Sequence, residues 1–385
     1  MTETAAPGGD GELVAALSAH GLYDPAAPDA EQRLALLRHY TERGITVEQM
    51  ASAEKEGRLP VLSGDLTFFD LGPQLTLDEV ALACGVSVDR VRRTRVATGL
   101  PTEREDEVPA WVVEDISGFL VAAELFGEPA TLAFSRLLGS TASRLAEAAV
   151  SLFLTEVDRG LAERQAPPVE WALANEQAGY LVGVASTISS HLLREHLSRA
   201  IRRQRALVSP GGGAVVSTTI GFVDLVRSTE WASTLTPLAQ ADALAVFESA
   251  AWDLTTRHNG RVVKLIGDEV MFVADDAADA CRIGLELCAA IAEEETLPAA
   301  RAALGYGEVA FRDGDFFGPL VHVTARAVKA AEPATVVATD GVRESCEHEA
   351  TGLSFEPLGA RELRGVPDPV ELYLVSASGR SRAPS

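Results

Sequence analysis

The chain has 385 residues and a formal net charge of −23, with 47% hydrophobic and 23% charged residues. This length allows two or three domains and excludes a single small module, and the composition is that of a mostly folded soluble protein. The negative charge argues against nucleic-acid binding, because it repels the phosphate backbone unless a local basic patch overrides it.

Both ends of the chain, residues 1–11 and 379–385, are predicted to be disordered tails. The first is rich in Gly, Ala and Pro and has neither the basic start nor the apolar core of a signal peptide. No apolar stretch approaches the about 18 residues that a membrane span needs, so we expect a cytoplasmic protein with no membrane contact. The cysteines form no CxxC pair and are expected to be reduced core thiols. They are Cys84, Cys281, Cys288 and Cys346.

Residues 12–205 are predicted to form an all-helical domain. Leu34, Leu37 and Tyr40 recur at helical spacing before a stop at Gly44. Residues 75–100 have the pattern of a helix-turn-helix, with a capping Thr76, a turn at Gly85 and a second helix rich in arginine. Two long helical tracts follow, at 115–157 and 170–205. The second ends in a basic linker helix, 186–205, before the glycine-rich segment 209–213.

Residues 206–378 change to alternating strands and helices and are predicted to form an α+β domain. Strands are expected at 214–223, 261–266, 269–273, 302–309 and 335–338. Helices are expected at 238–258, 277–295 and 321–331. Gly267-Asp268 is the natural turn of a tight hairpin. The order matches a ferredoxin-like βαββαβ core, so the fold class is α+β with an all-α N-terminal half.

Three side chains of this domain favour a phosphate and metal chemistry. Asp224 ends the first strand and Asp268 lies at the hairpin tip, where two carboxylates could bind Mg²⁺ or Mn²⁺. Each Asp is also a common turn residue. Lys264 shares a strand face with Val262 and Ile266 by simple alternation, so it must reach a cleft or a partner, or else be a surface lysine of an edge strand.

Together these motifs resemble the class III adenylate and guanylate cyclases over most of 214–375. The resemblance implies that Asp224, Asp268 and the backbone of Leu225 hold two metal ions. It implies that Lys264 and Asp315 read the purine of ATP, because guanylate cyclases carry Glu and Cys there. The resemblance further implies that Arg326 stabilises the pentavalent phosphate, although alone it is an ordinary surface helix residue.

The resemblance also implies a loop for the triphosphate and a partner subunit. The loop is Leu225, Val226, Arg227, Ser228 and Thr229. In a head-to-tail homodimer, one chain supplies the metal ligands and this loop, and the other supplies Lys264, Asp315, His322 and Arg326. The expected reaction turns ATP into cyclic AMP and pyrophosphate.

Three positions depart from the family pattern. His322 stands where an Asn is usual, and it could donate a hydrogen bond or be merely structural. Arg227 replaces a Gly of the loop, where it could contact phosphate or block the loop. Glu308 lies near where some members place a phosphate-binding Arg, and it would repel a triphosphate that it faced.

Two alternative functions stay open, as does the regulator. A catalytically inactive cyclase-like protein could bind nucleotide and signal through its dimer, and a DNA-binding regulator could use residues 75–100. The helical half resembles regulatory domains of actinobacterial cyclases of the pH-sensing type. Its regulator is then a proton, a small molecule or a lipid-like ligand. His191 and His196, beside the linker arginines, are candidate proton sensors or plain surface histidines.

Overall fold

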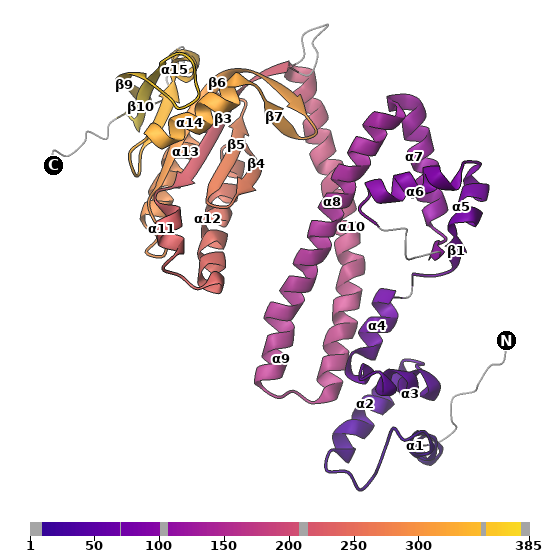
Figure 1. The fold of residues 1–385 in the computed structure, drawn as a ribbon. Helices are drawn as coiled ribbons and strands as arrows, with labels where there is room; N and C mark the ends of the chain where they lie inside the picture. Colours follow the sequence, from indigo (N-terminus) through magenta and orange to yellow (C-terminus); the bar gives the residue numbers. More distant parts are fainter. Residues whose placement is uncertain (1–9, 70, 101–106, 208–214, 348–351, 379–385) are drawn as a thin grey trace. The chain divides into compact units, whose positions relative to one another are not determined.

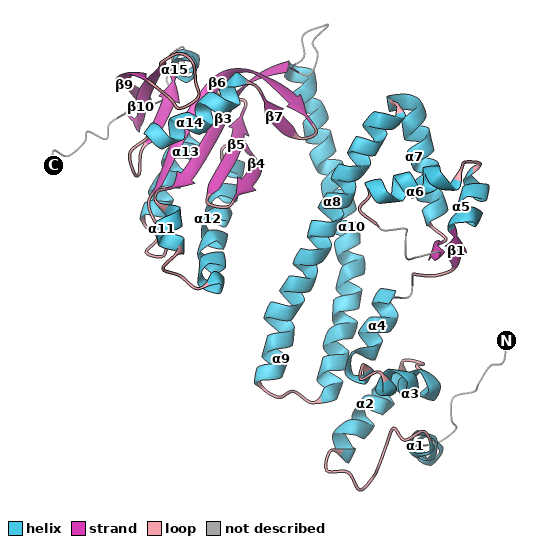
Figure 2. Cartoon of the chain, in the orientation of Figure 1, coloured by secondary structure: helices cyan, strands magenta, loops and turns pink. Residues whose placement is uncertain are grey.

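The computed structural model describes residues 10–69, 71–100, 107–207, 215–347 and 352–378. The chain divides into two compact units, Met1–Ser198 and Arg199–Ser385. The predicted C-terminal tail and the glycine-rich segment 209–213 lie outside the described residues, as do residues 1–9 of the predicted N-terminal tail. Residues 10 and 11 of that tail are instead the start of the first helix. The overall expectation of a helical half followed by an α+β half is confirmed (Figures 1 and 2).

The N-terminal unit is built from helices with one small two-stranded sheet. Its first group is α1 (Asp10–Ala19), α2 (Ala30–Glu42), α3 (Val47–Lys55), η1 (Leu59–Val61) and α4 (Leu62–Phe69). Its second group is β1 (Gln74–Thr76), α5 (Leu77–Cys84), α6 (Val88–Ala97), β2 (Glu107–Pro109) and α7 (Val112–Phe126). The long helices that follow are α8 (Glu128–Phe153), the π-helical η2 (Leu154–Asp158), α9 (Arg159–Glu163) and α10 (Pro168–Leu207). From Arg199 onward, α10 belongs to the second unit.

Residues 75–100 fold into the predicted helix-turn-helix, but arginines of its second helix form contacts within the chain. Thr76 and Glu79 form the predicted capping box, and Gly85 ends α5 in the left-handed conformation. Arg90 forms an ion pair with Glu128 at 2.9 Å. On the same helix, Arg93 lies 3.6 Å from Glu128 and Arg95 is buried. These contacts weaken the case for a DNA-reading helix.

The helix predicted at 115–157 is interrupted at Gly127. This residue has φ of 84° and ψ of 145°, and Pro129 follows it, so the chain turns and α8 starts afresh. From Glu128 to Glu163 the helix is then long and apolar enough to cross a membrane, by length and composition alone. The expectation that no segment passes this test was therefore wrong.

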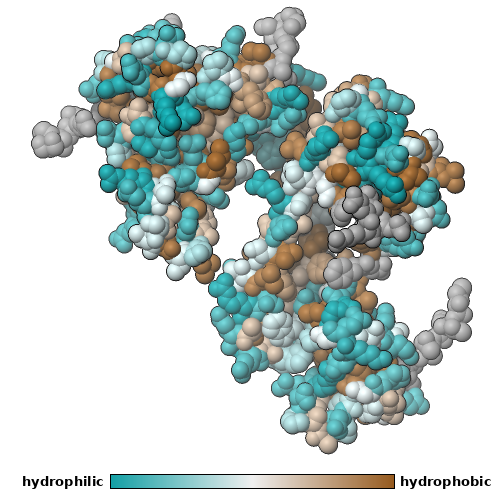
Figure 3. All heavy atoms as spheres, viewed as in Figure 1, coloured by the Kyte–Doolittle hydropathy of each residue, from teal (hydrophilic) through white to brown (hydrophobic). Residues whose placement is uncertain are grey.

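The middle of α8 buries no side chain within this chain. Every residue from 141 to 150 is exposed. Apolar residues also reach the surface of the helical unit in Figure 3. On α8, Phe134, Leu138, Leu145 and Leu152 are each more than half exposed, and their spacing puts them on one side of the helix. We call these four residues the α8 stripe.

The C-terminal unit is a layered α+β domain whose strands form one large sheet. Its strands are β3 (Val215–Leu225), β4 (Arg261–Ile266), β5 (Glu269–Ala274), β6 (Ala300–Arg312), β7 (Asp315–Phe317), β8 (Val336–Thr339), β9 (Leu353–Arg361) and β10 (Val370–Ala377). Its helices are α11 (Ser228–Ala232), α12 (Pro237–Arg257), α13 (Ala277–Ala292), α14 (Pro319–Ala327), η3 (Val328–Ala330) and α15 (Asp340–Cys346).

The sheet order is β4-β5-β3-β6-β8-β10-β9, with β7 paired to β6. Its first four strands have the order of a ferredoxin-like core, as predicted. The hairpin turn at Gly267-Asp268 is also confirmed, because Ile266 pairs with Glu269 across it. The strands β7, β9 and β10 were not among the predicted elements.

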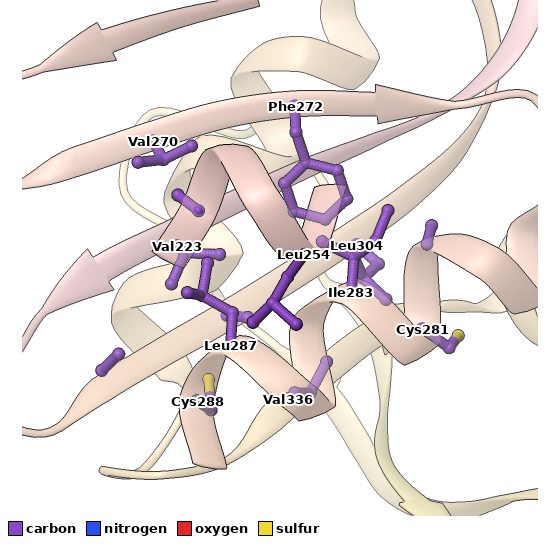
Figure 4. Packing of buried hydrophobic residues seen from close by; sticks show 14 of the residues in the cluster. Val223, Leu254, Val270, Phe272, Cys281, Ile283, Leu287, Cys288, Leu304 and Val336 are labelled. Atoms are coloured by element: carbon purple, nitrogen blue, oxygen red, sulfur yellow. The ribbon is translucent and has the colours of Figure 1, made fainter. Parts of the chain in front are cut away.

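Two apolar clusters hold the sheet on its opposite faces. One joins α12 and α13 to the sheet through side chains such as Leu254, Phe272 and Leu287 (Figure 4). The other joins α14 to the sheet through Phe222, Met271 and Ala327. Fully burying one such side chain stabilises the fold by about 1.5–3 kcal/mol. These two clusters therefore give the unit a hydrophobic core of its own.

Three of the four cysteines are buried free thiols of this unit: Cys281, Cys288 and Cys346. Burial raises the pKa of the Cys288 thiol to about 12. The pKa of Cys281 is also raised, because its thiol is hydrogen-bonded to Cys346 and buried. Both are thus protonated, unreactive thiols at neutral pH, in keeping with the expected core role.

Candidate active site

Two carboxylates meet where the first strand and the hairpin end. Asp224 lies in β3, opposite Glu269 of β5. The next residue, Leu225, donates its backbone N–H to the carbonyl oxygen of Asp268 at 3.2 Å. This bond ties the end of β3 to the hairpin tip. Asp224 and Asp268, predicted from separate motifs, are therefore neighbours in space.

Asp224 is held by two cations that the sequence analysis did not identify. Arg301, opposite it on β6, donates Nε and Nη2 to Asp224 Oδ2, both at 3.0 Å. Lys329 in η3 donates Nζ to the other carboxylate oxygen. Only 2% of the Asp224 side chain is exposed, so these partners offset the cost of burying its charge. Arg301 could have been identified in the sequence as a basic residue on the strand that pairs with Asp224.

A third carboxylate, Glu269, belongs to the same group. Its pKa is raised, first because the carboxyl is buried and then because Asp224 and Asp268 repel its charge. Lys329 and Arg326 act in the opposite direction. Four side chains therefore form one electrostatic cluster at the end of β3, with Arg326 of α14 within its range. They are Asp224, Asp268, Glu269 and Lys329.

The predicted triphosphate loop, Leu225–Thr229, turns sharply out of β3. The side chain of Leu225 is buried in the core, so only its backbone is available to a ligand. Val226 donates its N–H to the carbonyl of Ala299 at 2.9 Å. Ser228 donates its hydroxyl to the carboxylate of Asp268, and Thr229 is exposed.

Arg227 takes the backbone conformation that a glycine would favour. Its φ is 53° and its ψ is 35°, in the left-handed region that costs a residue with a side chain about 1–2 kcal/mol. The substitution for the usual Gly therefore keeps the glycine-like backbone and leaves the Arg227 side chain exposed.

Lys264 and Asp315 form an ion pair. Lys264 Nζ lies 2.5 Å from Asp315 Oδ2, and Asp315 Oδ1 accepts the N–H of Phe316 at 2.8 Å. The two residues come from β4 and from β7, which are not neighbours in the sheet. Arg261 of β4 also stacks over the Phe316 ring. The short strand β7 thus brings Asp315 to the edge strand.

The reasoning from strand alternation about Lys264 was wrong in one respect. A β-bulge between Val262 and Lys264 shifts the register, so Val262 pairs with Phe272 and Lys264 with Met271. Val262 then packs in the first cluster, whereas Met271 belongs to the second. The bulge therefore puts Lys264 on the face of α14 rather than on the face of Val262.

His322 and Arg326 lie one turn apart on the exposed side of α14, and Lys329 follows in η3. The buried side of this helix packs tightly on β6. A Cβ at Gly305 of β6 would collide with the Thr324 hydroxyl of α14 and lie 3.0 Å from a methyl of Leu320. The absence of a side chain at residue 305 therefore lets the helix approach the strand closely.

Glu308 does not lie at this end of the sheet. It pairs with Ser217, whereas Arg301 pairs with Asp224 seven residues away along β6. At about 3.3 Å per residue this is roughly 20 Å. Glu308 is therefore too far from Asp224 of the same chain to repel a triphosphate bound there. The cation of β6 that lies beside Asp224 is Arg301.

The donor set at the strand ends suits a hard divalent cation. Asp224, Asp268 and the carbonyl of Leu225 are oxygen donors of the kind that Mg²⁺ and Mn²⁺ prefer. No cluster of three or more His, Cys, Asp or Glu side chains in the described ranges is arranged to hold a metal by itself. Further oxygens must therefore come from water or from a bound nucleotide.

Comparisons with known proteins cover most of the chain. An uncharacterised protein of Mycobacterium tuberculosis is 30% identical over 370 residues, which is 95% of each chain. A pH-sensitive adenylate cyclase of the same species is 27% identical and matches 89% of this chain and 88% of its own. An adenylate cyclase of Streptomyces griseus is 34% identical over 58% of this chain and 55% of its own. No family model matches.

Among solved structures, the adenylyl cyclase CyaB from P. aeruginosa matches 44% of this chain and 99% of its own. Its sequence identity is 19% and its TM-score is 0.39. A guanylate cyclase domain from Catenaria anguillulae, in complex with GTP, matches 42% of this chain and 96% of its own. Its identity is 20% and its TM-score is 0.38.

Proposed function

Since the chain belongs to the class III nucleotide cyclase family, we propose that it is an adenylate cyclase that converts ATP to 3′,5′-cyclic AMP and pyrophosphate. The observation that carries the proposal is the placement of Lys264 with Asp315, and of Asp224 with Asp268, around the face of the sheet that α14 covers. The chain's relatives named as adenylate cyclases favour ATP.

Lys264 and Asp315 are proposed to read the purine. The Lys264 ammonium donates to a ring nitrogen of adenine, and the Asp315 carboxylate accepts from its amino group. Guanine presents a carbonyl oxygen at the corresponding ring position, which would face the carboxylate with no proton between them. The two groups already lie side by side in the free protein, which supports the proposal that they act on one base.

Asp224 and Asp268, with the carbonyl of Leu225, are proposed to hold two Mg²⁺ or Mn²⁺ ions. When bound, these ions supply neutralisation of the triphosphate and a lower pKa for the ribose 3′ hydroxyl. The N–H groups of the loop 225–229 bind phosphate oxygens. The 3′ oxygen and the α-phosphorus belong to one ATP, so the protein positions the two and forms no covalent intermediate.

Arg326 is proposed to stabilise the charge that develops on the α-phosphate, and His322 to donate a hydrogen bond beside it. Both lie on the exposed side of α14, where a ligand can reach them. In the proposed head-to-tail homodimer they act with Lys264 and Asp315 on a nucleotide held by the partner's carboxylates and loop. The enzyme is proposed to work in the cytoplasm.

The helical N-terminal unit is proposed to regulate the catalytic domain. One relative that matches most of this chain is named as pH-sensitive. His191 and His196 are exposed on α10 and are candidate proton sensors. A small molecule or a lipid-like ligand is the alternative regulator.

The test is cyclic AMP formation from ATP with Mn²⁺ and with Mg²⁺, by the full chain and by residues 206–385, at acid and neutral pH. Asp224→Ala is the control. Activity of the fragment that the substitution removes supports a cyclase, and a lower or more pH-sensitive full-length rate supports an inhibitory helical unit. ATP binding with no cyclic AMP under any condition would leave an inactive nucleotide-binding signalling protein.

A further inference from the structure

The two cations on Asp224 suggest how the site controls metal entry, provided that the proposed function holds. We propose that Lys329 is a positioning residue that occupies Asp224 in the free protein. It leaves Asp224 when a triphosphate binds, so that divalent metal and nucleotide bind to this site together and each strengthens the binding of the other.

The Asp224 carboxylate has no free oxygen in the described structure. Arg301 binds Oδ2 through two N–H groups, and Lys329 binds Oδ1. The carboxylate with its two partners carries a net charge of +1. A divalent cation that binds Asp224 must therefore displace one of these two basic side chains, although Asp268 and Glu269 nearby attract it.

Lys329 is the cation that can leave. Its side chain is 52% exposed, and a flexible stem carries its single ammonium. Arg301 is only 18% exposed, and besides its two bonds to Asp224 it donates Nη1 to the backbone carbonyl of Lys329 at 3.3 Å. Arg301 thus keeps Asp224 partly neutralised when Lys329 moves away.

A triphosphate gives Lys329 a stronger partner than Asp224. Its oxygens carry several negative charges, and charge-assisted bonds to phosphate are among the strong hydrogen bonds of proteins. Lys329 contacts Asp224, which directly precedes the proposed phosphate loop Leu225–Thr229, so it lies close to where a triphosphate held by its own chain would bind. Once Lys329 turns to phosphate, Asp224 Oδ1 is released for the metal.

Coupling of this kind is reciprocal. If nucleotide tightens metal binding by some factor, metal tightens nucleotide binding by the same factor. The free protein would then bind divalent metal weakly at Asp224, although the carboxylate is in place. Removing the Lys329 charge would open the site to metal without nucleotide.

The experiment measures Mn²⁺ binding to the full chain by electron paramagnetic resonance, with and without α,β-methylene-ATP. Samples without protein correct for the Mn²⁺ that the nucleotide itself binds. The wild type is compared with Lys329→Met, which keeps the stem and removes the charge, and with Lys329→Arg, which keeps the charge. Lys55→Met removes the same charge from an exposed position on α3 of the other unit and is the matched control.

We expect wild-type Mn²⁺ affinity to rise at least about tenfold with the nucleotide, within the usual range of such coupling. In Lys329→Met the nucleotide-free affinity should rise about tenfold, so that the coupling shrinks. Lys329→Arg and Lys55→Met should behave like the wild type. Lys329→Gln replaces Lys329→Met if the latter does not fold.

Two outcomes would overturn the inference: a wild type that binds Mn²⁺ equally well without nucleotide, or a Lys329→Met protein whose nucleotide-free affinity is unchanged. If the analogue binds to no variant, the proposed function fails instead. The nucleotide-free comparison of wild type with Lys329→Met still decides the role of Lys329, so the two failures are distinguishable.

Discussion

The two units of this chain bury their apolar residues in different ways. In the C-terminal unit, apolar side chains on both faces of the sheet pack into continuous clusters. In the N-terminal unit, the clusters around Tyr40 and around Val80 are small, and the α8 stripe lies in solvent. The C-terminal unit is therefore held together by its own core. The N-terminal unit contains long helices whose apolar side chains are only partly buried within one chain.

This difference separates two sources of helical structure. α13 is amphipathic and is stabilised by packing, as most helices of globular proteins are. The middle of α8, residues 141–150, has no buried side chain and depends on its alanine-rich helix propensity. Substitutions in the two units should therefore have unequal effects.

The largest effect should come from matched leucines in the two units. Leu287 is fully buried in the first cluster of the sheet, and Leu145 of the α8 stripe is 54% exposed. We expect Leu287→Ala to lower the free energy of unfolding by about 3 kcal/mol and Leu145→Ala by less than about 1 kcal/mol, in urea unfolding of the full chain. Equal losses would mean that the α8 stripe is covered in solution.

The next effect concerns catalysis, at the exposed side of α14. If Arg326 stabilises the transition state, Arg326→Ala should lower kcat about 100-fold, as the loss of one such donor commonly does. Glu308→Ala, at the other end of β6, should leave kcat within about twofold. Initial rates of cyclic AMP formation with Mn²⁺ measure both, and a comparable loss in the two variants would refute the assignment of Arg326.

A smaller effect tests an ion pair of the N-terminal unit. Glu176 of α10 accepts a hydrogen bond from Arg43 at 2.5 Å, and His39 Nε2 lies 3.2 Å from its other oxygen. The bond from Arg43 lowers the pKa of Glu176 from its ordinary value of 4.5. A carboxyl with a lowered pKa stabilises the fold above the ordinary value, and this stabilisation is lost as the pH falls through the folded value.

We therefore expect the wild type to lose more thermal stability than Glu176→Gln when the pH falls from about 5 to about 3. The difference should be below about 1 kcal/mol, because the pair is partly exposed. Thermal unfolding at a series of pH values measures it. A parallel decline of both proteins would show that this pair does not contribute.

The smallest effect should be a gain in the C-terminal unit. Arg227→Gly removes a side chain from the left-handed region and should raise the free energy of unfolding by up to about 1 kcal/mol. Asn259→Gly is the control, since Asn259 has φ of 55° and asparagine tolerates this region better. Urea unfolding should show the larger gain for Arg227→Gly, and a loss would mean that the Arg227 side chain makes stabilising contacts.

Local signals in the sequence were enough for much of the fold. The capping box at Thr76 and the turn at Gly267 are interactions between residues close in the chain, so their patterns can be read directly. The strands β9 and β10 were missed although the closing segment resembled the family. They pair with each other and with β8, and this pairing depends on contacts distant in sequence.

The site was harder to predict where a single backbone irregularity changes the direction of a side chain. The bulge beside Lys264 reverses its face, and no residue type at 262–264 marks it. Lys329 lies 105 positions from Asp224, so no local pattern could pair them. Motif likeness named Asp224, Asp268, Lys264 and Asp315. The register of β6 and the end of α14 were needed to find Arg301 and Lys329.

The close approach of α14 to β6 at Gly305 has a mechanical consequence. Thr324 rests against the strand where Gly305 has no side chain, so no deformable layer of long side chains separates helix and sheet at this point. His322 and Arg326 therefore share the stiffness of the sheet. A slide of the helix toward Ala303 would drive Thr324 against the Cβ of that residue, so a signal that moves His322 and Arg326 in this direction must move strand and helix together.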